Sequence, residues 1–202
     1  DHLERFKRIR QKCDEKKITL WAGMRPGDKR FCKNKADRDA FNGNAAIYIE
    51  NGAKGFYFAG DDTHPKDANN PYGHICPDDA VYHARLIEDL QNKIGDNLKS
   101  ICGQQYKGDS FDHCKKYWAP IFEVLKPDVM LTWTGPQTWN RELTGRDFSW
   151  INRPVMLFDN FFANNSKKPE KVPIYPYTGR DNTLVTAVEA AVINPGLHFP
   201  YQ

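Results

Sequence analysis

The sequence predicts an α/β fold in which helices alternate with short buried strands of one parallel sheet. Three observations support this prediction. Several segments carry apolar residues every three or four positions, which is the spacing of an amphipathic helix. Six short apolar runs end at Gly, Pro, Asp or Asn, as buried strands do. The two kinds of segment alternate along the chain, and that order is typical of a parallel sheet covered by helices.

The first helix is predicted by Leu3, Phe6, Ile9 and Cys13, which recur at helical spacing in a charged background. The apolar run 18–24 then stops at a Pro-Gly turn over 25–27 and predicts the first strand. The second helix, over 36–48, ends at Asn51-Gly52, a typical C-terminal cap, and the aromatic strand 55–59 follows it. Two helix-to-strand steps are therefore complete by residue 60.

The same order continues to the end of the chain. Pro77-Asp78 opens a third helix that runs to Gly95, and the strand 98–102 follows. Three further steps consist of a helix over 114–125 with the strand 129–133, a short helical stretch near Asp147 with the strand 155–158, and a short helix over 183–187 with the strand 190–193. No linker rich in Ser, Gly or Pro divides the sequence, so we expect a single domain over residues 1–202.

Composition excludes several classes of protein. The chain has 202 residues and a net charge of +3, with 40% hydrophobic and 27% charged residues. This balance is that of a folded globular chain and not of a disordered segment or a nucleic-acid-binding polycation. The apolar runs, such as 45–49 and 155–158, are far shorter than the roughly 20 residues of a membrane-spanning helix. We therefore expect no membrane span and no nucleic-acid partner.

The five cysteines do not form a recognisable metal motif. No two of them have C-x-x-C spacing, which disfavours a zinc cluster. Their spacing leaves a disulfide open, since a secreted protein of this size can contain one or two. The sequence starts with Asp1 and without an initiator Met, as a processed or cut chain does, and the compartment stays open.

Polar residues gather directly after the predicted strands, where parallel α/β folds bind ligands. Asp61 and Asp62 follow the second strand, and they could simply cap a helix or solvate a loop. Aromatic and amide side chains follow other strands, and such a mixture suits a sugar, which offers C–H faces and hydroxyls. We expect one rim of the sheet to carry these side chains: Asp61, Tyr106, Thr134, Asn160 and Asn194.

These positions carry a resemblance to a known family. The segments WTGP at 133–136, FDNFFANN at 158–165, PYTGR at 176–180 and INP at 193–195 resemble the barrel of glycoside hydrolase family 84, the β-N-acetylglucosaminidases. Asp61-Asp62 is similar to the family's catalytic pair, the turn at 24–27 to its S-P-G turn, and CGQQY at 102–106 to its C-P-T-E-Y segment. The resemblance spans residues 18 to 199 and follows the family's order.

The resemblance implies a (β/α)8 TIM-barrel-like fold that is incomplete at the N-terminus, with about six βα units. A complete barrel has eight units and typically about 250 residues. Before Asp1 there is no counterpart of the family's first strands, which carry a Gly-rich sugar-binding turn and a Lys. We expect another segment or a partner to cover the sheet edge that this leaves.

The activity implied is hydrolysis of terminal β-linked N-acetylglucosamine by retaining, substrate-assisted catalysis through an oxazoline, without cofactor or metal. The substrate is a carbohydrate or a glycoprotein that carries this sugar. By resemblance, Asp61 stabilises the oxazoline, and Asp62 protonates the leaving oxygen and then activates water. The resemblance also implies the substrate-binding residues, of which Trp133 and Phe158 form the apolar wall: Tyr106, Trp133, Thr134, Phe158, Asn160, Asn165 and Asn194.

Two alternatives stay open at this point. The family places a sugar-binding Asp where this chain has Asn165, so the protein could bind N-acetylhexosamine without cleaving it, as a lectin-like pseudoenzyme. A metal-dependent polysaccharide deacetylase would use Asp61-Asp62 with His64 and His74. In such deacetylases the two histidines lie close together on one helix. In this chain, prolines at 65 and 71 lie between His64 and His74.

Overall fold

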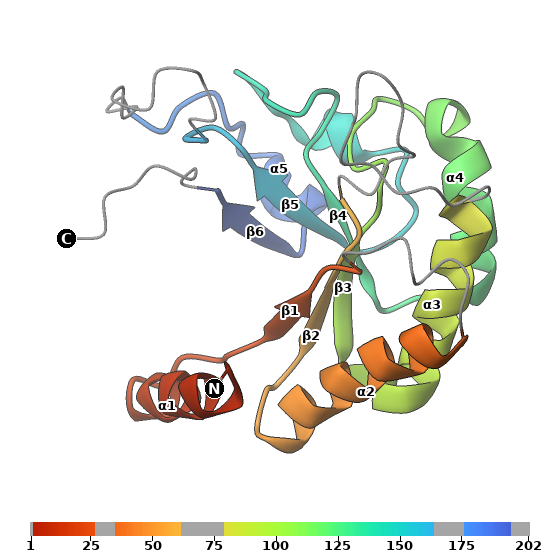
Figure 1. Cartoon of the computed structure of the whole chain (residues 1–202). Coiled ribbons are helices and arrows are strands. Elements are labelled where there is room, and N and C mark those ends of the chain that lie inside the picture. Colours follow the sequence, from red (N-terminus) through yellow and green to blue (C-terminus); the bar gives the residue numbers. More distant parts are fainter. Residues whose placement is uncertain (1, 27–34, 62–78, 164–175, 195–202) are drawn as a thin grey trace, which may run out of the picture. The chain divides into compact units, whose positions relative to one another are not determined.

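The chain forms two compact units (Figure 1). The computed structural model describes residues 2–26, 35–61, 79–163 and 176–194. The first unit comprises Asp1–Gln104 and Lys116–Val129, and the second comprises Gln105–Lys115 and Met130–Gln202.

The first unit is a parallel three-stranded sheet covered by helices. The strands β1 (Ala22–Met24), β2 (Phe56–Ala59) and β3 (Leu98–Cys102) lie in that order, with β2 in the centre. Helices α2 and α3 lie side by side against one face of these strands (Figure 1). The helices of the unit are α1 (His2–Glu15), α2 (Lys35–Glu50), α3 (Asp79–Ile94) and α4 (Phe111–Val124), whose residues from Lys116 onward belong here, with a 3-10 turn η2 (Gly95–Asn97) after α3.

Aromatic rings fill the space between this sheet and its helices. Phe56 and Phe58 of β2 are completely buried, and Phe41 of α2 meets both rings edge-on at centroid distances of 6.4 and 6.1 Å. Phe58 also meets the buried ring of His83 on α3 at 5.8 Å. Burial of each such side chain contributes about 1.5–3 kcal/mol to folding. The alternating burial of β2 thus fixes which strand face meets the helices.

The second unit also contains three parallel strands. Its strands are β4 (Met130–Trp133), β5 (Val155–Asp159) and β6 (Ala190–Ile193), and β5 pairs with both of the others. A 3-10 turn, η3 (Gly145–Phe148), and one helical turn, α5 (Leu184–Ala187), connect them. Strands β4 and β5 are largely buried, whereas β6 leaves Val192 40% and Ile193 46% exposed.

The predicted alternation of six strands with helices is confirmed within the described residues. The expected caps are also confirmed, because Gly52 and Gly95 have φ angles of +99° and +59°, where a residue with a side chain is disfavoured. The sequence predicts the first strand over 18–24, but it is only Ala22–Met24, because Ile18 donates its N–H to Cys13 O and still belongs to the end of α1. Helix α4 begins at Phe111, three residues before its predicted start.

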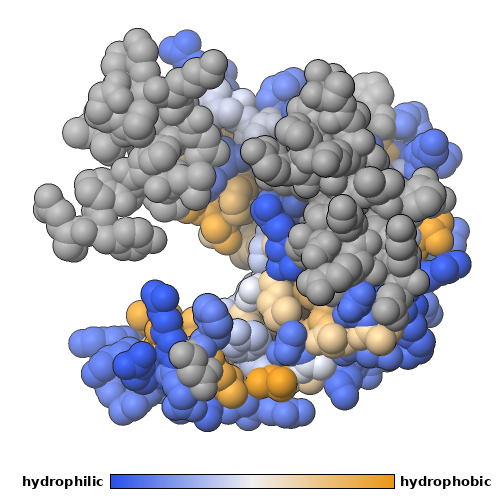
Figure 2. Space-filling model, viewed as in Figure 1, coloured by the Kyte–Doolittle hydropathy of each residue, from blue (hydrophilic) through white to orange (hydrophobic). Residues whose placement is uncertain are grey.

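Helix α1 contributes no buried residue to the first unit. Hydrophilic side chains cover most of the α1 surface that Figure 2 displays, with a few apolar patches between them. Ile9 of this helix is 44% exposed. Among the described helices none is long and apolar enough to cross a lipid bilayer.

Gly103, directly after β3, provides a test of this packing. A Cβ atom there would lie 2.6 Å from the buried Trp118 ring and 2.7 Å from the Tyr117 ring. We expect Gly103→Ala to lower the free energy of unfolding by about 1–3 kcal/mol, because overpacking forces these rings from their positions. Gly43→Ala is the matched control, since nothing lies within 4 Å of a Cβ in that helical position. It should stabilise the protein by about 0.5–1 kcal/mol. Urea unfolding measures both, and equal effects of the two changes would contradict the packing described.

Candidate functional site

In the first unit, Asp61 lies just beyond the carboxyl end of β2. Its carboxylate accepts a hydrogen bond from Arg25 Nη2 at 2.6 Å, and its side chain is 27% exposed. Gly60 precedes it and donates its N–H to Cys102 O at 2.7 Å, which ties the ends of β2 and β3 together. A Cβ on Gly60 would lie 2.7 Å from the Phe58 ring, so the backbone here requires glycine. Asp62 lies outside the described residues.

A buried network holds the segment after β3. The backbone N–H of Gln104 donates to Tyr117 Oη at 2.8 Å, and Tyr117 Oη lies 2.6 Å from His83 Nδ1. Both side chains are buried, since Tyr117 is 5% exposed and His83 is 2% exposed. Because a buried polar group needs a partner, this network fixes where the chain leaves the sheet. It therefore fixes the start of the segment that carries Tyr106.

In the second unit, the segment after β3 joins the end of β4. Thr134 is buried, and it donates its backbone N–H to Tyr106 O at 2.8 Å. Trp133 is 0% exposed and donates its indole N–H to Gly108 O at 3.1 Å. Tyr106 and Phe158 are half-buried. Thus Tyr106 and Thr134, two of the predicted site residues, are brought together.

The loop after β4 is organised by the buried side chain of Asn140. Its Nδ2 donates to Thr134 O and Gln137 O at 2.7 and 2.8 Å, and its Oδ1 accepts the Gln137 N–H at 3.0 Å. Gly135 has a φ of +102°, and a Cβ there would lie 2.6 Å from Leu143. The Thr-Gly-Pro sequence thus makes a tight turn that only glycine fits at its second position.

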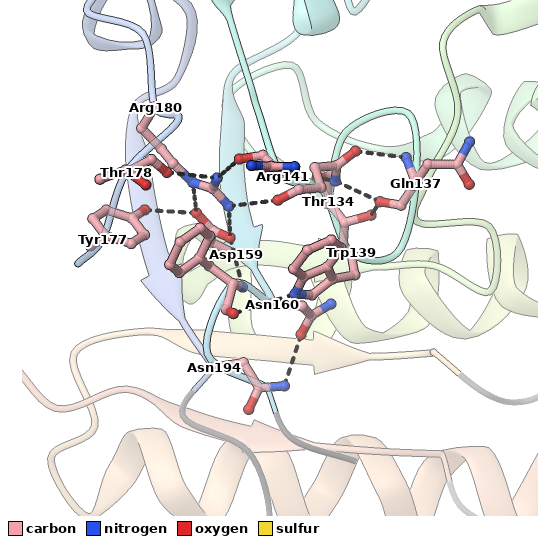
Figure 3. Close-up of polar contacts among 12 residues, drawn as sticks. Thr134, Gln137, Trp139, Arg141, Asp159, Asn160, Tyr177, Thr178, Arg180 and Asn194 are labelled. Atoms are coloured by element: carbon pink, nitrogen blue, oxygen red, sulfur yellow. Dashed lines mark hydrogen bonds and ion pairs between the residues drawn. The ribbon is translucent and has the colours of Figure 1, made fainter. Parts of the chain in front are cut away.

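Asn160 and Asn194 form the second pair of predicted site residues that the structure brings together (Figure 3). Asn194, just after β6, donates from Nδ2 to Asn160 Oδ1 at 2.8 Å. Asn160, just after β5, donates from its own Nδ2 to Thr138 O at 2.8 Å. Trp139, beside Thr138, is 47% exposed, and its indole N–H lies 3.3 Å from Phe161 O. Three loops thus converge on Asn160.

An ion pair of Asp159 and Arg180 lies next to Asn160 (Figure 3). Arg180 Nη2 and Nε donate to the two carboxylate oxygens of Asp159 at 2.6 and 2.7 Å, and the side chains of Arg180 and Asp159 are only 9% and 2% exposed. Asp159 also accepts hydrogen bonds from Tyr177 Oη at 2.7 Å and from the Phe161 N–H at 2.9 Å. Burial raises the pKa of Asp159, but the hydrogen bonds and charge of Arg180, with the Tyr177 and Phe161 hydrogen bonds, outweigh it and leave the pKa below its ordinary value.

Sequence reasoning assigns no role to this ion pair. In the sequence, Asp159 is only a polar residue after a strand, and Arg180 is only the last residue of the PYTGR segment. The one signal is a charged residue at the end of an otherwise apolar strand, which requires a partner when it is buried. Asn140 and Trp139 are missed as well, because nothing in their local spacing distinguishes them from ordinary loop residues.

The Asp159 carboxylate makes stability depend on pH in a defined direction. Its folded pKa is depressed, so its contribution is fully present above the ordinary Asp pKa of about 3.9 and is lost as the pH falls through the folded value. We expect Asp159→Asn to make the free energy of unfolding less dependent on pH below about pH 4. Urea unfolding of both proteins between about pH 2 and 7 tests this.

The control for that measurement is Asp96→Asn. Asp96 pairs with Lys126 at 2.7 Å, but its side chain is 83% exposed and the solvent screens the pair. The pH profile should therefore change less than in Asp159→Asn. Identical profiles of the wild type and Asp159→Asn would contradict the role given to this carboxylate.

No group of His, Cys, Asp and Glu side chains suited to a metal ion occurs within the described ranges. Cys13, Cys102 and Cys114 are free thiols. Burial raises the pKa of Cys114 to about 11, so its thiol is protonated near neutral pH. His64 and His74, which the deacetylase alternative requires, lie outside the described residues, as does Asn165.

Comparison with known proteins identifies similarities in sequence and fold. The family model described as β-N-acetylglucosaminidase matches residues 1–200. Protein O-GlcNAcase of Rattus norvegicus and that of Mus musculus are each 24% identical to this chain over 87 residues, which is 41% of this chain and 9% of those proteins.

The fold is similar to that of a mutant of Thermobaculum terrenum O-GlcNAc hydrolase. The TM-score is 0.78 at 19% sequence identity, and the match covers 96% of this chain and 43% of that chain. The expected fold class, a partial (β/α)8 barrel of about six βα units, is thereby confirmed. The chain spans less than half of that solved structure and about a tenth of the curated relatives.

Proposed function

Because the chain belongs to the β-N-acetylglucosaminidase family, glycoside hydrolase family 84, we propose that the protein hydrolyses terminal β-linked N-acetylglucosamine. In this proposal the acetamido oxygen of the substrate attacks the anomeric carbon, the bond to the leaving oxygen breaks, and an oxazoline forms. Water then opens the oxazoline with retention of configuration. The substrate is a carbohydrate or a glycoprotein that carries this sugar.

The two aspartates have different roles in this proposal. Asp61 holds the acetamido N–H and stabilises the positive charge of the oxazoline. Asp62 gives its proton to the leaving oxygen and later takes one from the attacking water. Asp61 accepts a hydrogen bond from Arg25 Nη2 at 2.6 Å, which holds its carboxylate at the carboxyl end of β2. This contact supports the role of Asp61.

The observation that carries the proposal is the Asn160–Asn194 pair. A sugar presents hydroxyl and acetamido groups that both donate and accept, and a primary amide does the same. Asn160 uses one N–H on Thr138 O and one lone pair on Asn194, so its remaining donor and acceptor capacity suits such a ligand. Tyr106, Thr134 and Asn165 are the further polar contacts we propose, with Trp133 and Phe158 as apolar wall.

One observation favours a second function, binding of N-acetylhexosamine without cleavage. Asn165 occupies the position of the family's sugar-binding Asp and lacks its charge. An amide is a weaker acceptor for a sugar hydroxyl than a carboxylate is. A protein that binds the sugar without cleaving it would act as a lectin.

Hydrolysis of a chromogenic aryl β-N-acetylglucosaminide separates these functions. Turnover that is lost in Asp61→Asn and unaffected by a chelator supports the proposed hydrolase. Binding of N-acetylglucosamine without turnover supports the lectin. Release of acetate without release of the phenol, abolished by the chelator, supports the deacetylase. The Asp109→Asn variant, changed at an exposed loop carboxylate, is a matched control that should keep the wild-type rate.

A further inference from the structure

Every N–H group of the Arg180 guanidinium donates a hydrogen bond. Besides its two bonds to Asp159, Nη1 donates to Arg141 O at 2.8 Å and to Thr178 O at 3.2 Å, and Nη2 donates to Asn140 O at 3.1 Å. A guanidinium has five N–H donors, so these bonds use all of them. The group also lies over the Phe161 ring, 4.4 Å from its centroid. Arg180 is therefore fixed in position and orientation.

Outside its own segment, the partners of Arg180 lie at the end of β5 and in the loop after β4. Asp159 is the last residue of β5 and directly precedes Asn160. Asn140 and Arg141 lie in the loop after β4, and the same loop supplies Thr138 O, the acceptor of the Asn160 amide. Arg180 thus joins the strand end that carries Asn160 to the loop that orients it (Figure 3).

A purely structural role explains this arrangement poorly. A buried ion pair loses the hydration of both charges, and well-packed apolar residues often stabilise a protein as much or more. The unit already has apolar and aromatic side chains at this place, since Phe161 and Tyr177 meet edge-on at 5.2 Å. What the ion pair adds is directional bonding, which holds backbone carbonyls of one loop at a set distance from the end of β5.

We propose that Arg180 and Asp159 are positioning residues that orient the Asn160 side-chain amide toward the sugar. This inference rests on the proposed function for the identity of the ligand, but the orientation itself is a property of the protein alone. Neither residue is required to touch the substrate. The effect of removing either one should therefore pass through Asn160.

The direct test measures the Asn160 amide and needs no substrate. In ¹⁵N-labelled protein, the Asn160 side-chain signal is assigned by its loss in Asn160→Ala, and its hydrogen exchange with water is measured. In Arg180→Met this exchange should become about fivefold faster or more, because the hydrogen bond from Asn160 Nδ2 to Thr138 O is no longer held. Arg38→Met is the matched control, since Arg38 forms a partly buried ion pair with Asp89 in the other unit. It should leave the Asn160 exchange rate unchanged.

A second variant keeps the test valid if Arg180→Met does not fold. Arg180→Lys retains a charge for Asp159, but an ammonium has three donors and cannot hold both Asp159 oxygens and the loop carbonyls. It should also accelerate Asn160 exchange. An unchanged Asn160 signal and exchange rate in a folded Arg180 variant would overturn the inference, whatever the protein hydrolyses.

Kinetics provide the second readout. With an aryl β-N-acetylglucosaminide, Arg180→Met should lower kcat/KM by up to about 100-fold, the size of effect that a small misplacement of a binding group produces. The double variant Arg180→Met/Asn160→Ala should be no slower than Asn160→Ala alone. Additive losses would overturn the inference. If the wild type shows no turnover, the proposed function fails, and the exchange measurement still decides on the positioning role.

Discussion

Asp62→Asn should distinguish substrates by their leaving groups. Removal of the proposed general acid should slow substrates with a poor alkoxide leaving group by about 10²–10⁴-fold, because such a group departs only when it is protonated. Activated aryl glycosides should lose far less, since a nitrophenolate leaves with little protonation. The measurement is kcat/KM for a series of β-N-acetylglucosaminides that differ in the pKa of the leaving phenol or alcohol.

Asp61→Asn is the comparison within the same pair. Loss of the Asp61 carboxylate weakens the acetamido nucleophile that all these substrates share. Hydrolysis of both kinds of substrate should therefore slow by a similar factor. Equal losses for all leaving groups in Asp62→Asn, or full activity in either variant, would exclude the proposed roles. Asp61 and Asp62 would then have no catalytic role.

Trp133→Ala should be among the most destabilising single changes in the second unit. The Trp133 ring is 0% exposed and meets Trp150 edge-on at 5.2 Å, so truncation leaves a large cavity. It also leaves Gly108 O without its indole donor. We expect the free energy of unfolding to fall by about 3–5 kcal/mol, measured by denaturant unfolding. Trp133→Phe, which keeps much of the volume, should lose less.

Trp139→Ala is the control for that experiment. Its ring is 47% exposed, so its removal should cost about 1 kcal/mol or less. Similar losses for Trp133→Ala and Trp139→Ala would contradict the burial described. If Trp133 forms the apolar wall of a sugar site, as the family resemblance implies, Trp133→Phe should also weaken sugar binding while the protein stays folded.

Most of the fold can be predicted from local patterns in the sequence. The aromatic run and its turn residues predict a strand over 55–59, and β2 is Phe56–Ala59. The end of α2 follows from Asn51-Gly52, since the positive φ at Gly52 is a local requirement. The first strand is overestimated because Ile18 is apolar, and nothing local shows that its N–H bonds to the end of α1.

The candidate site is predictable only in part. Asn160 and Asn194 are both found because each directly follows a strand, and parallel strands bring their carboxyl ends to one edge. The partner of Asp159 cannot be found in this way. Arg180 lies in a loop 21 residues further along, and its selection depends on distances that only the folded loops define.

The chain passes from the first unit into the second and back again before it completes the second. The first unit includes Lys116–Val129 as well as the residues up to Gln104, and the segment between them belongs to the second unit. A nascent chain that has reached only Gln104 still lacks Trp118 and Tyr117, the rings that close over Gly103. Gln91 likewise lacks Val124 O, the carbonyl to which it donates. The first half of the sequence therefore lacks part of the packing of the first unit, and no single cut in the chain separates the two units intact.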